Sequence, residues 1–305
     1  MFKNMNKGYL LVTLTAIISG FAIFVNKFGV GIFKSAEVYT FLRVALVALI
    51  LGSLLLFFDL KRIKTLKKRE WIFLALIGLV GGSIPFLLFF KGLKITSSAE
   101  GSFIHKTMFL WVAILALLFL KEKIDRKFIF GASILLFANA LLLKKFSFVP
   151  DRGDLLILIA TLFWAVENTL SKYLLSTSNL DGKTVAFGRM FFGSIFIFIY
   201  LLFTAQASQI FVLNLKQIIW VLITGIILFF YVITWYSGLK YVPVSKATVI
   251  LLLGSPITTL LNLISGAKIP LQEIASGILI LAGIITIFAT KKILENLKSL
   301  IYARA

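Results

Sequence analysis

Long apolar runs, separated by short polar or basic connections, fill most of the sequence. Many runs approach the ~20 residues that an α-helix needs to cross the ~30 Å hydrocarbon core of a bilayer. The alternation of apolar and polar residues that marks a membrane strand is absent. We therefore predict an all-α integral membrane protein with ten transmembrane helices, near residues 7–27, 36–58, 71–92, 99–120, 128–143, 154–174, 184–204, 217–238, 245–264 and 272–290.

The composition agrees with this pattern and excludes several classes of function. Hydrophobic residues make up 60% of the chain and charged residues only 14%, whereas soluble domains carry roughly 25% charged residues. The chain has no cysteine, so disulfides, thiol chemistry and thiolate metal sites are excluded. No nucleotide-binding loop occurs, which argues against ATP-driven pumping by this chain alone.

The basic residues indicate how the chain crosses the membrane. The net charge is +20, but the basic residues lie mainly in the connections, so we predict no nucleic-acid partner. With a cytoplasmic N-terminus, the inner segments hold 20 Lys and Arg residues and the outer segments hold nine. Basic residues concentrate on the cytoplasmic side of membrane proteins. We therefore predict a multi-pass protein of a prokaryotic inner (plasma) membrane with both termini in the cytoplasm.

Two segments outside the predicted spans have a pattern of their own. Residues 61–70 contain six basic residues, a pattern that suits a topology anchor better than a site for an anionic lipid. Residues 291–305 place apolar side chains at helical spacing. They predict an amphipathic cytoplasmic tail lying on the inner membrane surface.

The two halves of the chain match at a nearly constant offset. Phe41-x-Arg43 falls on Phe187-x-Arg189, and Gly92-Leu93-Lys94 falls on Gly238-Leu239-Lys240, both 146 residues later. We predict two repeats of five helices, over residues 7–143 and 154–290. Five is an odd number, so the second repeat would enter the membrane from the opposite side. Inverted repeats are common in secondary transporters, which bind substrate near the bilayer midplane.

The sequence resembles the EamA-type branch of the drug/metabolite transporter superfamily from about residue 9 to residue 290. The residues that carry the resemblance are Ser19-Gly20-Phe21, Asn26-Lys27, Phe163-Trp164-Ala165, Ser171-Lys172, Arg43, Arg189, the two Gly-Leu-Lys segments, Leu120-Lys121-Glu122-Lys123-Ile124 before Gly131, and Gly254-Ser255-Pro256. The resemblance implies that spans 1, 3, 4, 6, 8 and 9 line a central path. It also implies transport of amino acids or other small metabolites. Lys268 stands where the first half has Glu122, which departs from the pattern.

Glu167 is the leading candidate for a substrate or proton site. It lies about 13 residues into the sixth predicted span, where an ionisable group costs about 2.5–3.5 kcal/mol to insert. Trp164, Asn168 and Ser171 lie at positions i−3, i+1 and i+4 relative to Glu167 and give the helix one polar and aromatic face. A carboxylate that binds a cation or takes up a proton is one interpretation. A carboxylate that serves only helix packing is the other.

Further polar and aromatic residues could line the same path. His105 is the only histidine, and Lys106 beside it could pair with Glu167, bind a substrate carboxylate or extend to the interface. Aromatic walls are predicted from Trp111, Tyr231 and Trp235, although lipid-facing or packed aromatics are the more common case. A structural role is favoured over substrate contact for Arg43 and Arg189, and Asn26 belongs either to the structural framework or to the path.

These features predict a secondary transporter or exporter of a small polar, amino-acid-like metabolite, working by alternating access. A translocase of a lipid or lipid-linked carrier is the nearer alternative. A membrane-embedded enzyme acting on lipid-linked substrates is more distant, because no catalytic residues, metal ligands or cofactor site are evident. Membrane lipids and a small-molecule substrate are the expected partners, and proton coupling through Glu167 is a further hypothesis. The pattern leaves the oligomeric state open.

Overall fold

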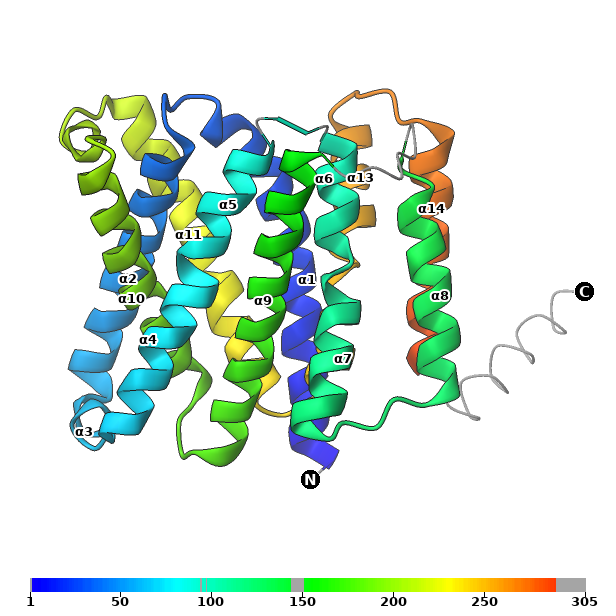
Figure 1. Ribbon diagram of the computed structural model, residues 1–305, viewed down its shortest axis with the longest axis horizontal. Coiled ribbons are helices and arrows are strands. Elements are labelled where there is room, and N and C mark those ends of the chain that lie inside the picture. The colour runs from blue at the N-terminus through cyan, green and yellow to red at the C-terminus, as the bar shows by residue number, and fades with distance from the viewer. Residues whose placement is uncertain (1, 94, 97, 144–150, 289–305) are drawn as a thin grey trace, which may run out of the picture.

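The protein is a single bundle of roughly parallel α-helices (Figure 1). The computed structural model describes residues 2–93, 95–96, 98–143 and 151–288, and the described residues contain no strand. The predicted tail, 291–305, lies outside them. The helices are α1 (Phe2–Val30), α2 (Ala36–Phe58), α3 (Leu60–Lys64), α4 (Lys68–Gly82), α5 (Ile84–Leu93), α6 (Ser98–Lys106), α7 (Met108–Leu120), α8 (Arg126–Ala140), α9 (Arg152–Thr177), α10 (Gly182–Phe203), the short 3-10 helix η1 (Ala207–Ile210), α11 (Leu215–Leu239), α12 (Val244–Leu251), α13 (Gly254–Ile264) and α14 (Leu271–Phe288).

Within the described residues, nine helical segments are long and apolar enough to cross a membrane. They are α1, α2, α4 with α5, α6 with α7, α9, α10, α11, α12 with α13, and α14. The remaining predicted span, 128–143, coincides with α8, which has only 15 residues. At 1.5 Å per residue, α8 is about 22 Å long and shorter than the hydrocarbon core.

Side-chain caps define where several of the helices begin. A cap of this kind contributes about 1 kcal/mol, because it satisfies a backbone N–H that has no partner within the helix. The capping residues, each of which accepts a hydrogen bond from the backbone N–H three residues on, are Ser35, Asp125, Asp151, Asp181 and Asn214. These short polar side chains separate one apolar run from the next.

Three of the predicted continuous spans are interrupted. The third breaks at Ser83, between Gly82 and Pro85, where φ is −135° and ψ is −74°. The fourth breaks at Thr107, whose hydroxyl donates to the Ile104 carbonyl at 2.6 Å. The ninth breaks just before Gly254. Glycine, proline and side chains that compete for backbone carbonyls all weaken a helix locally.

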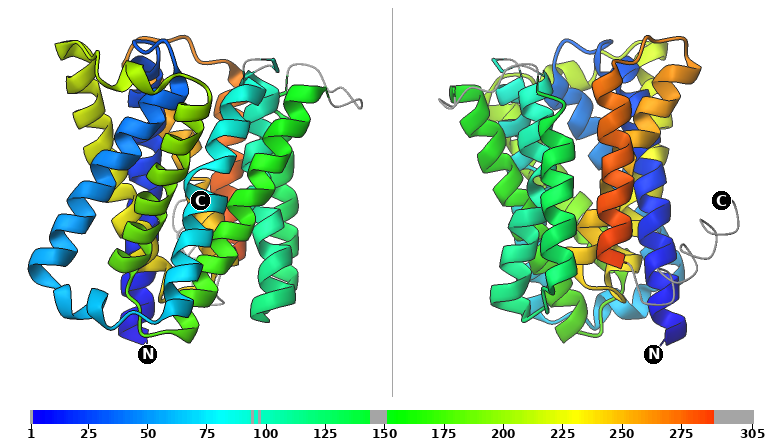
Figure 2. Two further views of the ribbon diagram at one scale, coloured as in Figure 1. Left: turned by 60° about the vertical axis from the view of Figure 1, so that its left-hand side comes forward. Right: turned by 90° about the vertical axis from the view of Figure 1, so that its right-hand side faces the viewer.

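Helices α9 and α10 are the most deeply buried of the membrane-spanning helices. In their most apolar windows 50% and 56% of the residues are buried, against 22–39% in the other spans. Helix α9 packs against α4, α5, α6 and α7, and α10 packs against α2, α4 and α11. Helices α8 and α14 lie side by side at one edge of the bundle (Figures 1 and 2). Any polar group on the inner faces of α9 and α10 is therefore enclosed by protein.

Candidate functional site

Glu167 is held inside the bundle by two hydroxyl groups. Its side chain lies near the middle of α9 and is 1% exposed. The hydroxyl of Tyr236, on α11, donates to Glu167 Oε1 at 2.6 Å, and the hydroxyl of Ser171 donates to the same oxygen at 2.8 Å. Both donors are themselves fully buried. The carboxyl group is thus fixed by two directed hydrogen bonds in a medium that penalises a charge without partners.

The broken helix α4–α5 supplies the backbone that Glu167 packs against. A Cβ atom at Gly81 would overlap Glu167 Cγ and lie 2.8 Å from its Cδ, so only glycine leaves room for this carboxyl group. The Gly81 carbonyl accepts hydrogen bonds from Trp164 Nε1 at 3.1 Å and from Arg189 Nη2 at 3.0 Å. Gly81 therefore joins α4, α9 and α10 at one point, next to the break at Ser83.

Arg189 brings a positive charge to this point. Its side chain is 7% exposed and lies near enough to Glu167 for the two charges to interact. Arg189 Nε is buried without a hydrogen-bond partner among the described residues. Tyr231, which is partly buried, interacts electrostatically with both groups. The structure thus brings the predicted Arg189 and Tyr231 into the Glu167 cluster.

Asn168 and Trp235 form a second pair beside Glu167. Trp235 Nε1 donates to Asn168 Oδ1 at 3.1 Å, and Asn168 Nδ2 donates to the Trp164 carbonyl at 2.8 Å. Both side chains are buried. Together with Glu167 and Ser171, they give a continuous polar seam between α9 and α11.

His105 meets the same seam through an aromatic group. Its ring lies 4.8 Å from the Trp164 ring and 5.3 Å from the Phe89 ring, between ring centres. His105 Nδ1 is buried and has no hydrogen-bond partner among the described residues. The adjacent break at Thr107 places this histidine at the end of α6. An unsatisfied ring nitrogen there is free to bind water or a ligand.

Within the described residues, no hydrogen bond or ion pair joins Lys106 or Trp111 to Glu167. Pairing with Glu167 was one of three alternatives for Lys106; in the structure the Glu167 carboxyl group is bound by hydroxyls, and Lys106 interacts electrostatically with Glu273 of α14. Trp111 Nε1 donates to Thr107 Oγ1 at 3.2 Å, within its own span.

Arg43 and Asn26 form a separate cluster between α1 and α2. Arg43 Nη1 donates to Asn26 Oδ1, which also accepts from the Tyr39 hydroxyl at 2.7 Å. The Arg43 guanidinium lies 4.9 Å from the centre of the Tyr39 ring. The described hydrogen bond of Arg43 thus goes to a neutral amide.

Two residues with defined contacts, Tyr236 and Glu122, are not among the site residues that the sequence predicts. The polar triplet Trp235-Tyr236-Ser237 inside an apolar span is the signal that points to Tyr236. Glu122 enters the sequence analysis only as part of the family resemblance. Its carboxylate accepts from the backbone N–H of Val244 at 2.7 Å and from the Ser245 hydroxyl at 2.5 Å, and thus caps α12. Within the described residues, no three histidine, aspartate or glutamate side chains converge on a metal-sized site.

Comparison with known proteins identifies the family of this chain. The model of the EamA-like transporter family matches residues 6–144 and again 151–289. The uncharacterized transporter YyaM of Bacillus subtilis is 24% identical over 91% of this chain and 92% of its own length. The riboflavin transporter ImpX of Fusobacterium nucleatum is 26% identical over 93% of this chain and 98% of its own. A solved crystal structure shares the fold, with a TM-score of 0.72 and 18% identity over 90% of this chain and 94% of that one. With two matches that together span most of its length, this multi-pass membrane protein belongs to the EamA-like transporter family.

Proposed function

We propose that this transporter moves a small polar metabolite by alternating access, along a path that includes the Glu167 cluster. The observation that carries the proposal is a carboxyl group that is 1% exposed, near the middle of a central span, at the junction of α4, α9, α10 and α11. An ionisable side chain at such a depth marks a substrate or ion pathway more often than a packing element. The path would include Trp164, Asn168, Ser171, Tyr231, Trp235 and His105, with Lys106 and Trp111 beside it.

The two predicted repeats, 7–143 and 154–290, would form the moving halves. The packing supports a one-to-one correspondence between the helices of the two repeats, in which α1, α2, α4–α5 and α6–α7 correspond to α9, α10, α11 and α12–α13. Helix α1 packs against α11 and α13, and α9 packs against α5 and α7; likewise, α2 contacts α11 and α10 contacts α4. The fourth and ninth spans break at Thr107 and Leu253, which are 146 residues apart. With α8 as the counterpart of α14, this gives ten spans in two inverted repeats.

Close contacts between glycines occur at corresponding positions of the two repeats. Gly8 lies against the Gly238 carbonyl, 3.2 Å from where a Cβ would stand, and Gly153 lies against the Gly92 carbonyl at 2.9 Å. The first pair joins α1 to α11, and the second joins α9 to α5. Gly92 and Gly238 are 146 residues apart, and Gly8 and Gly153 are 145 apart. Matching contacts at one offset support a pseudo-twofold relation between the halves.

The charge distribution supports a cytoplasmic location for both termini. Residue 2 and residue 288 lie at the same end of the bundle (Figure 1). The connections 59–67 and 121–125, which hold basic residues, lie at that end as well. Basic connections stay on the cytoplasmic side during insertion. We therefore assign this end to the cytoplasm and the membrane to a prokaryotic inner membrane.

The chemical groups of the Glu167 cluster support a particular class of substrate. Carboxyl, amide and hydroxyl groups suit a polar substrate, and the rings of Trp164, His105 and Phe89 suit a planar part of it. The riboflavin transporter ImpX is one of the relatives, so riboflavin belongs in a substrate screen beside amino acids. Thermal stabilisation of the purified protein by one compound class would identify the class.

Proton coupling through Glu167 is a further part of the proposal. The groups that face this carboxyl are Ser171, Tyr236, Tyr231 and Arg189. Arg189 is the one cation among these four groups. A substrate that displaced a hydroxyl donor would change the hydrogen bonding of the carboxyl group and so couple its own binding to that of a proton.

Flux into proteoliposomes tests the proposal. The wild-type protein is expected to move the stabilising compound down its gradient and to accelerate this flux when a pH gradient is imposed. The Glu167→Gln variant is expected to lose the pH-gradient dependence but to retain exchange of identical substrates. The matched control is Glu37→Gln, which neutralises a buried acid on α2 outside the cluster.

Three outcomes would reject parts of the proposal. A wild-type protein that binds and moves none of the compounds is not a metabolite transporter, and movement of a labelled lipid between leaflets would instead identify a translocase. Unchanged pH dependence in Glu167→Gln would reject proton coupling. Equal losses in Glu167→Gln and Glu37→Gln would return Glu167 to a structural role.

A further inference from the structure

A large cavity lies at the end of the bundle where α2 meets α3, away from Glu167. Its volume is about 1080 Å³. One wall is formed by the connection between α2 and α4 and the start of α4, and the other by the end of α9 and the loop that follows. Basic residues from the first wall are Lys61, Lys67 and Arg69, and polar residues from the second are Tyr173, Thr177 and Asn179. None of the residues that bind Glu167 lines it.

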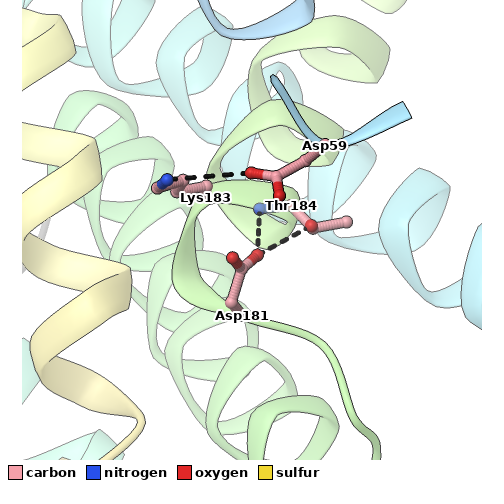
Figure 3. A network of polar contacts seen from close by, with 4 residues as sticks. All are labelled: Asp59, Asp181, Lys183 and Thr184. Atoms are coloured by element: carbon pink, nitrogen blue, oxygen red, sulfur yellow. Dashed lines mark hydrogen bonds and ion pairs between the residues drawn. The ribbon is translucent and has the colours of Figure 1, made fainter. Parts of the chain in front are cut away.

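The acidic residues of this cavity are engaged by the protein itself. Asp59 forms an ion pair with Lys183 at 3.7 Å, and Asp181 caps the start of α10 close by (Figure 3). The Glu70 carboxylate accepts the backbone N–H of Lys67 at 2.8 Å. The two carboxylates in the wall therefore have partners other than the basic side chains of the cavity.

The basic side chains are arranged to receive an anion. Arg69 Nη2 donates to the Tyr173 hydroxyl at 3.2 Å, and its guanidinium lies 5.5 Å from the centre of the Phe73 ring. These contacts hold Arg69 at the boundary between the two walls and leave its other N–H donors for a ligand. Lys61 and Lys67 are exposed and form no ion pair with any residue of the described chain. The cavity wall thus has an excess of positive charge.

An apolar surface adjoins these charges. Phe57 and Phe58, the last residues of α2, also line the cavity and are 83% and 78% exposed. They end a membrane-spanning helix, so they face the acyl-chain region where it meets the headgroups. A ligand that fits both surfaces has an anionic head and an apolar body. A free anion would use only the basic part.

The corresponding connection at the other end of the bundle lacks these features. Residues 204–214, between α10 and α11, contain no charged side chain and instead form η1 and expose Phe211 and Val212. The basic cavity is therefore not a by-product of the way the helices are joined. A topology anchor accounts for positive charge in the 61–70 segment, but it does not require a cavity with an apolar wall.

We propose that this cavity binds the headgroup of an anionic phospholipid. Lys61, Lys67 and Arg69 contact the phosphate, and the first carbons of the acyl chains lie along Phe57 and Phe58. Arginine and lysine are the usual phosphate-binding side chains, and clusters of them beside a membrane span attract anionic lipids. The proposal requires only that the chain is embedded in a membrane, so it is independent of the transport mechanism.

A single fluorescent label tests the proposal directly. The chain has no native cysteine, so Asn179→Cys provides one labelling position in the cavity wall. The labelled protein is placed in nanodiscs that contain either brominated phosphatidylglycerol or brominated phosphatidylcholine at the same fraction. We expect the anionic lipid to quench the label about three times more strongly. Equal quenching by the two lipids would overturn the proposal without any further variant.

Charge-matched variants separate the cavity from general attraction. Replacing Lys61, Lys67 and Arg69 with glutamine is expected to reduce quenching by phosphatidylglycerol to the phosphatidylcholine level. The control replaces Lys64, Lys68 and Lys123, which carry the same total charge and do not line the cavity. It is expected to retain strong quenching. An equal loss of quenching in both variants would show unspecific electrostatic attraction and would overturn the proposed site. Relief of quenching by millimolar inorganic phosphate would also overturn the proposal, because it would identify a site for a free anion.

Discussion

Arg43 and Arg189 occupy corresponding positions in the two halves of the chain, yet their surroundings differ in charge. Arg43 binds the side-chain amide of Asn26 and lies over the Tyr39 ring. Arg189 binds the Gly81 carbonyl and lies near the Glu167 carboxyl. Both arginines leave Nε buried without a described partner. The arginine is thus a shared feature, whereas the Glu167 carboxyl group belongs to the second half.

The residue offsets show which residue of the first half corresponds to the acid. At the offset of 145 that holds for the first span, Asn26 corresponds to Ser171, and Ala22 corresponds to Glu167. Asn26 Nδ2 donates to the Ala22 carbonyl at 2.7 Å, whereas Ser171 donates to the Glu167 side chain. At these two positions the first half therefore forms its hydrogen bond with neutral groups. This difference supports placing the proposed proton step in the second half.

Replacing each arginine with glutamine should give the largest difference in stability between the two halves. Arg189→Gln removes a charged hydrogen bond to the Gly81 carbonyl and the cation beside a buried acid, so we expect the free energy of unfolding to fall by about 3 kcal/mol. Arg43→Gln should cost about 1 kcal/mol, because Arg43 is only partly buried and Asn26 keeps its bond to Tyr39. Unfolding by SDS in mixed micelles measures both values. Equal losses would contradict the difference in surroundings described above.

Filling the space at Gly81 should have the next largest effect. In Gly81→Ala the new methyl group would collide with Glu167, and overpacking in a close-packed interior typically costs 1–3 kcal/mol. We expect a loss of about 2 kcal/mol in SDS unfolding and a slower substrate flux. Gly277→Ala is the control, since the nearest atom to a Cβ there is Pro256 Cβ at 3.5 Å. A Gly81→Ala variant as stable and active as this control would show that Glu167 moves aside easily.

The sequence predicted those parts of the site that depend on spacing within one helix. Glu167 and Ser171 are four residues apart, so a shared helix face follows from geometry alone, and the structure joins them. The polar contacts between helices were beyond this reasoning. Tyr236 is 69 residues from Glu167, and Arg189 is 108 residues from Gly81. Such contacts depend on how two helices are rotated against each other, which a single sequence does not specify.

The fold shows the same division between local and distant information. Apolar length identified the membrane-spanning segments, and the start and end of α2 agree with the predicted 36–58. The break at Thr107 was not predicted, because it lies inside a run that remains apolar enough to span. Gly81, Gly82 and Pro85 marked the first break in the sequence, whereas Thr107 has no such neighbour. The position of such a break depends on how the neighbouring helices pack around it, which the local sequence does not specify.

Removing one hydroxyl from the second half should have a smaller effect than filling the space at Gly81, and it gives the sharpest comparison. Tyr236→Phe deletes the 2.6 Å hydrogen bond to Glu167 but keeps the buried ring. We expect a loss of about 1.5 kcal/mol, the lower end of the range for a bond to a charged group, because Ser171 still donates to the same oxygen. Tyr231→Phe is the matched control on the same helix, since the Tyr231 hydroxyl makes no hydrogen bond to any described residue. Its expected loss of stability is below roughly 0.5 kcal/mol, the scale for a substitution that removes no specific contact. If Glu167 binds a proton during transport, Tyr236→Phe should also shift the pH dependence of flux, whereas Tyr231→Phe should shift it less. A shift of equal size in both variants would mean that the phenol ring, and not its hydrogen bond, sets the environment of the acid.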